Sequence, residues 1–195
     1  MPKIYIIAGC NGAGKTTASY TVLPEILGCR EFVNADNIAV GLSPFNPERV
    51  AFEAGRLMLK QIWELMEDEV DFAFETTLAT RSYVSFIKEA KKKGYEINLL
   101  YFWLKSPEFA IQRVAQRVSK GGHNIPNQVI IRRYYRGIKN LFDLYIPVCD
   151  TWMVIDNMDL IPEIIAQNGL KSDKPEILDE NNWDKILKQR DEFSQ

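Results

Sequence analysis

Residues 8–17 of the chain read AGCNGAGKTT and follow directly on the apolar run IYII (residues 4–7). The stretch contains the pattern G-x-x-x-x-G-K-[ST], with Gly9, Gly14, Lys15 and Thr16 at its four defining positions. The glycines permit a sharp exit from a strand and let backbone N–H groups approach phosphate oxygens. Lys15 adds a positive charge, Thr16 offers a hydroxyl to Mg²⁺, and the following helix directs its positive end at the anion. The pattern therefore predicts a site for the phosphates of a nucleotide.

We expect the nucleotide to lie along residues 9–17 of this loop. The contacting residues are predicted to be Gly9, Asn11, Gly12, Ala13, Gly14, Lys15, Thr16 and Thr17. Cys10 lies inside the loop, and we interpret it as a small apolar filler that faces away from the ligand, as free cysteines commonly do.

Composition indicates one ordinary globular domain over residues 1–195. The chain has 46% hydrophobic and 26% charged residues, a net charge of -2 and a pI of about 5.6, so no overall positive field attracts nucleic acid or an anionic membrane. No apolar run approaches the roughly 18 residues of a membrane span, and the start lacks the regions of a signal peptide. Three scattered cysteines are typical of a reducing compartment. We therefore expect a cytoplasmic protein.

Apolar runs of strand length alternate with helical patterns along the chain. Strands are expected over residues 3–8, 31–36, 71–75, 97–104 and 152–156, and helices from residue 15 and over 48–69, 81–93, 106–120 and 127–145. This alternation predicts an α/β fold with a parallel, doubly wound sheet, whose ligands bind at the carboxyl ends of the strands. The charged tail, about residues 159–195, reads as two short helical pieces.

Three carboxylates end predicted strands. Asp36, in NADNI, is either a base that takes a proton from an attacking hydroxyl or an N-cap of the element that follows. The order of the strands along the chain favours Glu75 over Asp156 for contact with the metal or the substrate, and we interpret Asp156 as a turn residue.

A basic segment extends over about residues 113–137. No Asp or Glu occurs between Gln112 and Ile138, whereas six cationic residues do: Arg113, Arg117, Lys120, Arg132, Arg133 and Arg136. Two helices joined through Gly121 and Gly122 would form a lid whose arginines bind phosphate, although a solvated helix face is the simpler alternative. His123, the single histidine, is either a turn residue or a substrate contact.

In combination, GCNGAGKTT, NADNIA, FETTLAT and the run through GGHNIP to IRRYYRGIKNL resemble the zeta-toxin family of P-loop kinases, over about residues 4–157. The resemblance implies a three-layer α/β/α kinase fold with a five-stranded parallel sheet and a helical lid. It also implies ATP, Mg²⁺ and phosphoryl transfer to a hydroxyl of UDP-N-acetylglucosamine or a similar metabolite. Nothing in the chain displays a surface for an antitoxin partner, which such toxins can have.

Residue by residue, the resemblance assigns Lys15 and Thr16 to the phosphate loop, Asp36 to the catalytic base and Glu75 to the carboxylate that opens a Glu-x-Thr motif. Thr76 stands where the family usually has glycine. The catalytic residues are then expected to be Asp36, Lys15, Arg117, Arg132 and Arg133, and the metal ligands Thr16 and Glu75. The substrate contacts are expected to be Glu75, Thr76, Thr77, His123 and Arg136.

Two other functions fit a phosphate loop: a GTP-dependent switch and a nucleotide-binding regulatory NTPase without kinase activity. The chain contains no N-K-x-D motif for reading guanine, which counts against the first. The sequence thus favours a small-molecule kinase.

Overall fold

A mixed sheet forms the centre of the molecule. The computed structural model describes residues 1–122, 124–159, 161–168 and 174–192. Within them, the strand order is β2-β3-β1-β4-β5-β6-β7. The parallel strands are β1 (Lys3–Ala8), β2 (Glu31–Val33), β3 (Phe72–Thr76), β4 (Glu96–Trp103) and β5 (Thr151–Asp156), and β6 (Glu163–Asn168) and β7 (Pro175–Ile177) are antiparallel. The predicted α/β class and the five parallel strands are confirmed.

The prediction for the tail was wrong in its first half. Residues 163–168 and 175–177 are strands that extend the sheet from five to seven strands, and only α7 (Glu180–Glu192) is helical. The reason is tertiary: β5 would otherwise be an edge strand with unpaired backbone groups, which β6 satisfies. Ile165 and Ala166 of β6 are fully buried against the core, and this burial outweighs the polar composition of the segment.

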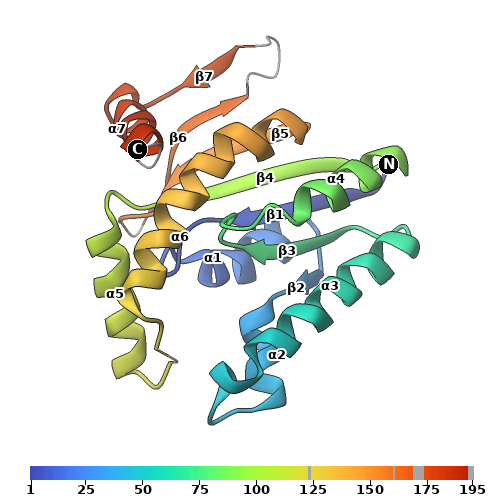
Figure 1. Cartoon of the computed structure of the whole chain (residues 1–195). Helices are drawn as coiled ribbons and strands as arrows, with labels where there is room; N and C mark the ends of the chain where they lie inside the picture. Colours follow the sequence, from blue (N-terminus) through green and yellow to red (C-terminus); the bar gives the residue numbers. More distant parts are fainter. Residues whose placement is uncertain (123, 160, 169–173, 193–195) are drawn as a thin grey trace.

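Helices connect the strands and flank the sheet. They are α1 (Lys15–Thr21), α2 (Ala35–Leu42), α3 (Ala51–Glu67), α4 (Tyr83–Lys92), α5 (Pro107–Ser119) and α6 (Asn127–Asn140). Short helical turns follow α1 (Val22–Ile26), precede α3 (Pro47–Val50) and continue α6 (Leu141–Tyr145, Ile146–Val148). Figure 1 shows the α5–α6 pair on one side of α1 and the α2–α3 pair on the other. Among the described residues, no helix has the length and apolarity that crossing a membrane requires.

The helix α2 corrects the prediction that Asp36 ends the second strand. The strand ends at Val33, and the side chain of Asn34 accepts hydrogen bonds from the backbone N–H groups of Asp36 (2.7 Å) and Asn37 (3.2 Å). Asn34 is therefore the N-cap, and Asp36 lies in the first turn of the helix. The alternative that Asp36 is an N-cap was therefore wrong as well, because Asn34, two positions earlier, caps the helix.

The core lies on both faces of β4. Leu99, Tyr101, Phe102 and Trp103 are all buried, as expected for a strand that helices cover on each side. Beside it, β1 pairs with β3 so that Ile7 lies opposite Glu75 and Ala8 opposite Thr76. This register places the carboxyl end of β3 next to the glycine-rich loop that leaves β1.

Candidate active site

The loop between β1 and α1 has the conformation that its glycines permit. Gly9, Gly12 and Gly14 all have positive φ, at 141°, 81° and 80°. A side chain at Gly9 would overlap the backbone carbonyl of Phe102, and one at Gly14 would overlap the amide of Asn157. That amide donates to the carbonyl oxygen of Ala13 at 2.7 Å, so the segment after β5 holds the loop from outside.

Glu75 is the centre of a polar cluster at the loop. Its Oε2 accepts hydrogen bonds from the Thr16 hydroxyl and from the Asn34 Nδ2, each at 2.6 Å, and its Oε1 lies 3.3 Å from the Lys15 Nζ. Lys15 also donates to the carbonyl oxygen of Cys10 at 3.0 Å. The side chains of Lys15 and Glu75 are only 6% and 12% exposed, so each charge depends on the other.

The oxygens of Thr16 and Glu75 fit a magnesium ion chemically. Mg²⁺ prefers hard oxygen ligands and is held in nucleotide sites by one or two protein oxygens together with phosphates and water. Thr16 and Glu75 both line the same cavity. The fit thus rests on these two adjacent donors, and no cluster of three His, Cys, Asp or Glu side chains occurs among the described residues.

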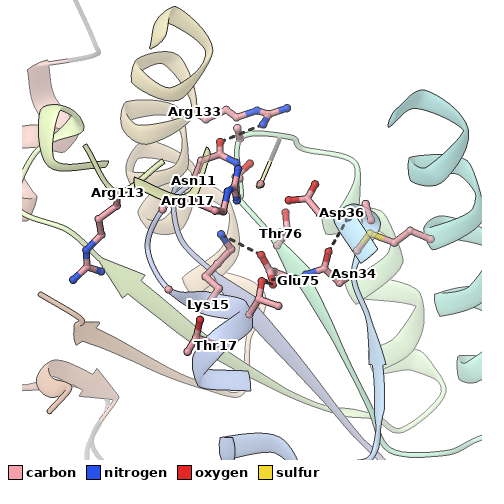
Figure 2. A pocket seen from close by; sticks show the side chains of 18 of the residues that line it. Asn11, Lys15, Thr17, Asn34, Asp36, Glu75, Thr76, Arg113, Arg117 and Arg133 are labelled. Carbon is pink, nitrogen blue, oxygen red and sulfur yellow. Dashed lines mark hydrogen bonds and ion pairs between the residues drawn. The ribbon is translucent and has the colours of Figure 1, made fainter. Parts of the chain in front are cut away.

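Asp36 faces the same cavity from the first turn of α2, and Arg133 faces it from α6. Figure 2 shows Asp36 beside Asn34, with Arg133 across the space above the loop. Burial lowers the pKa of Arg133, and the negative charge of Asp36 opposes that shift. Arg133 also donates to the Asn11 Oδ1 at 3.2 Å, which ties α6 to the loop.

The cavity has a volume of about 970 Å³. One wall is cationic, from α5 and α6, and the opposite wall holds the two carboxylates and several hydroxyls. Of the predicted site residues, those that line it are Asn11, Gly12, Gly14, Lys15, Thr16, Thr17, Asp36, Glu75, Thr76, Thr77, Arg117, Arg132, Arg133 and Arg136. Gly9 and Ala13 do not line it, because Ala13 is fully buried and Gly9 packs against β4. His123 lies outside the described residues.

The basic residues do not all serve the cavity in the same way. Arg113 lines it, but its guanidinium donates to the Met158 carbonyl oxygen at 2.7 Å and lies over the Phe109 ring. Figure 2 shows the Arg113 side chain pointing away from Lys15 and Glu75. Arg113 therefore fixes α5 against the segment after β5.

The helix α6 is anchored along its length. The Tyr134 hydroxyl donates to the Leu104 carbonyl oxygen at 2.6 Å and lies 3.0 Å from the Gln189 Oε1 on α7. Farther along α6, the Asn140 Nδ2 donates to the Leu78 carbonyl oxygen at 2.6 Å. The lid over about residues 113–137 remains a prediction.

Sequence reasoning missed several residues of the cavity. Asn34, Met58, Thr80 and Tyr83 all line it. The signals were present but unspecific: Asn34 precedes a helix that the pattern analysis did not identify, and Thr80 belongs to the hydroxyl-rich TTLAT after the third strand.

Three comparisons place the chain among known proteins. The family model of the zeta toxin matches residues 43–156, more than half of the chain. An uncharacterized protein of Haemophilus influenzae is 28% identical over 132 residues, which cover 68% of this chain and 92% of the relative.

Solved structures share the fold. The AvrRxo1-ORF1:AvrRxo1-ORF2 complex, solved with sulphate ions, has a TM-score of 0.76 at 17% identity, covering 95% of this chain and 63% of that chain. The same complex solved with ATP has a TM-score of 0.75. A structure from the PezAT toxin–antitoxin system of Streptococcus pneumoniae has a TM-score of 0.62 at 14% identity, covering 100% and 87%. The chain thus spans less than two thirds of the AvrRxo1 chain that it matches.

Proposed function

Because the chain belongs to the zeta-toxin family, we propose that it is an ATP-dependent phosphotransferase that moves the γ-phosphate of ATP to a hydroxyl of a small molecule. Family and fold support nucleotide binding and a kinase-type activity. The single observation that carries the finer proposal is the cavity. There, the phosphate-loop residues Lys15 and Thr16 share one space with Asp36, Glu75 and the arginines of α5 and α6.

In this proposal the triphosphate lies on residues 9–17. Backbone N–H groups of the loop and the Lys15 ammonium bind its oxygens, while the N-terminus of α1 adds a favourable field. Thr16 and Glu75 would hold Mg²⁺, which, when bound, neutralises charge that develops on the phosphates. Lys15 would exchange its present contact with Glu75 for the nucleotide, so its ammonium remains paired.

In this proposal Asp36 acts as the base toward the hydroxyl of the acceptor. A carboxylate can take the proton of the attacking hydroxyl, and the neighbouring arginines Arg117, Arg132 and Arg133 would stabilise the transferring charge. Phosphoryl transfer depends mainly on alignment and on charge neutralisation, so this geometry matters more than the strength of the base.

The acceptor would lie against the wall that contains Thr76 and Thr77, called here the acceptor wall, with Glu75 at its inner end and Arg136 contributed by α6. We propose a sugar nucleotide such as UDP-N-acetylglucosamine as the acceptor class, on the basis of the family. The cavity volume of about 970 Å³ lies at the upper end of the roughly 300–1,000 Å³ of small-molecule pockets. The PezAT neighbour comes from a toxin–antitoxin system; for this chain the proposal covers the enzyme and its small-molecule acceptor.

One experiment tests the proposal and identifies the acceptor. The protein is incubated with γ-labelled ATP and a metabolite extract, and the labelled product is identified by mass, with Lys15→Ala as the control. We expect label in a phosphorylated metabolite that is absent with the variant. Label only in inorganic phosphate would instead support the regulatory NTPase, and preferential binding of GTP would support the switch.

A further inference from the structure

Asn34 uses both ends of its side chain amide. It lies between β2 and α2 and is only 4% exposed. Its Oδ1 caps α2 by accepting from the backbone N–H groups of Asp36 and Asn37. Its Nδ2 donates to the Glu75 Oε2 at 2.6 Å and lies 3.3 Å from the Thr16 hydroxyl. Figure 2 shows Asn34 between Glu75 and Asp36.

These bonds allow the amide only one orientation. If the group were turned over, its NH₂ would face two backbone N–H groups and its oxygen would face the Glu75 carboxylate, so every bond would be replaced by a repulsion. A buried polar group with all its partners in place is rigid, and losing one partner is costly. Asn34 therefore holds a fixed position between α2 and the end of β3, two elements that are far apart in the sequence.

Asn34 joins the Glu75 carboxylate to the helix turn that carries Asp36. Its acceptor end fixes the first turn of α2, which carries Asp36, and its donor end fixes Glu75 at the end of β3. We propose that Asn34 is a positioning residue, which sets the place of Asp36 relative to Glu75 and the phosphate loop. This inference rests on the proposed function, in which these side chains serve one reaction.

The variant Asn34→Asp separates the two ends. It keeps an acceptor for the α2 backbone but places an oxygen where the NH₂ contacted Glu75. Two carboxylates in contact repel one another, so this variant loses the donor and gains an unfavourable charge beside Glu75. The charged groups around the pair are Lys15 from α1 and Asp36 from α2, with Arg133 of α6 acting on Asp36.

The split between kcat and the affinity for ATP distinguishes positioning from a general structural effect. We expect the kcat of Asn34→Asp to fall roughly 10- to 100-fold below wild type, as with outer-shell partners of other sites. A general loss of structure would lower the affinity for ATP in the same proportion as kcat.

The variant Asn34→Ser tests the donor end alone. Serine is a good N-cap but is too short to reach Glu75 as well. We expect a melting temperature below wild type, because Glu75 loses a buried donor, and a reduced kcat, with the affinity for ATP alone little changed. The matched control is Asn37→Ser, in the same helix turn, whose Nδ2 donates to the exposed Tyr20 hydroxyl at 3.0 Å. It should keep the wild-type kcat.

Wild-type kcat in Asn34→Ser, or an affinity for ATP that falls in proportion to its kcat, would overturn the inference. If instead the wild type transfers label to no acceptor, the proposed function fails, and thermal unfolding still tests the contacts of Asn34. The melting temperatures of Asn34→Ser and Asn34→Asp should then both lie below wild type, because each variant removes the donor to Glu75. A wild-type melting temperature in both variants would refute the bond between Asn34 and Glu75.

Discussion

Gly137 brings the backbone of α6 close to the acceptor wall. A Cβ added there would lie 2.6 Å from the Thr77 carbonyl oxygen, whereas ordinary contacts begin at 3.4 Å. In Gly137→Ala the two backbones would have to separate by about 0.8 Å (3.4 − 2.6). The two backbones cannot separate easily, because the Asn140 Nδ2 of the same helix donates to the neighbouring Leu78 carbonyl oxygen at 2.6 Å.

Two opposing effects set the size of the change in stability. Overpacking costs typically about 1–3 kcal/mol. Replacing a glycine by alanine inside a helix contributes about 0.8–1 kcal/mol in the other direction. The net loss in the free energy of unfolding is therefore roughly 0–2 kcal/mol. The helix α3 offers a matched control, since a Cβ at Gly55 would meet nothing within 4 Å.

Urea unfolding of both variants isolates the packing effect. Gly55→Ala should gain about 0.8–1 kcal/mol, and the difference between the two variants should be about 1–3 kcal/mol. In a chain of this length, each kcal/mol corresponds to roughly 2–4 °C in melting temperature. In a phosphotransfer assay, Gly137→Ala should also raise the KM for the acceptor, because Thr77 and Arg136 line the cavity on either side of the contact. Equal stabilisation by both substitutions would refute the close contact.

Three further outcomes are expected. Lys15→Ala and Asp36→Ala should both abolish measurable turnover. Asp36→Ala should leave the affinity for ATP largely intact, because a general base contributes about 10²–10⁴-fold to the rate without holding the nucleotide. Turnover in Asp36→Ala comparable to wild type would show that Asp36 is not the base. Treatment with peroxide should leave the affinity for ATP unchanged, because burial raises the pKa of the Cys10 thiol to about 11 and keeps it protonated at neutral pH. A loss of ATP affinity that a thiol reductant reverses would contradict this expectation. Gln189→Ala should lower the free energy of unfolding, measured in urea, by about 1–3 kcal/mol, because the Trp103 indole N–H loses its acceptor at 3.0 Å. An unchanged midpoint of urea unfolding would show that water replaces the glutamine.

The parts of the fold that the sequence predicted are those with a local pattern. The strand, glycine loop and helix over residues 3–21 were recognisable because each glycine and Lys15 has a specific spacing. The five parallel strands were recognisable because buried strands are continuous apolar runs. Asp36 and Glu75 could be placed near the loop because the carboxyl ends of parallel strands meet at one edge of a sheet.

Other features depend on contacts that no local pattern encodes. The strand β6 forms because β5 offers a free edge, although the composition of its residues suggested a helix. The bond between Asn34 and Glu75 joins residues 41 positions apart, and the contact between Tyr134 and Gln189 joins residues 55 positions apart. Neither partner carries a sign of the other in the sequence.

The amino-acid sequence alone determined that this chain holds a phosphate loop in an α/β sheet, because spacing and apolar periodicity act over a few residues. Only the tertiary structure decided that Asn34 links Glu75 to the helix turn that carries Asp36, and that α6 is held against the acceptor wall. Those arrangements arise when separate elements bury their polar groups against one another, and a buried amide takes whichever partners the packed fold brings within reach.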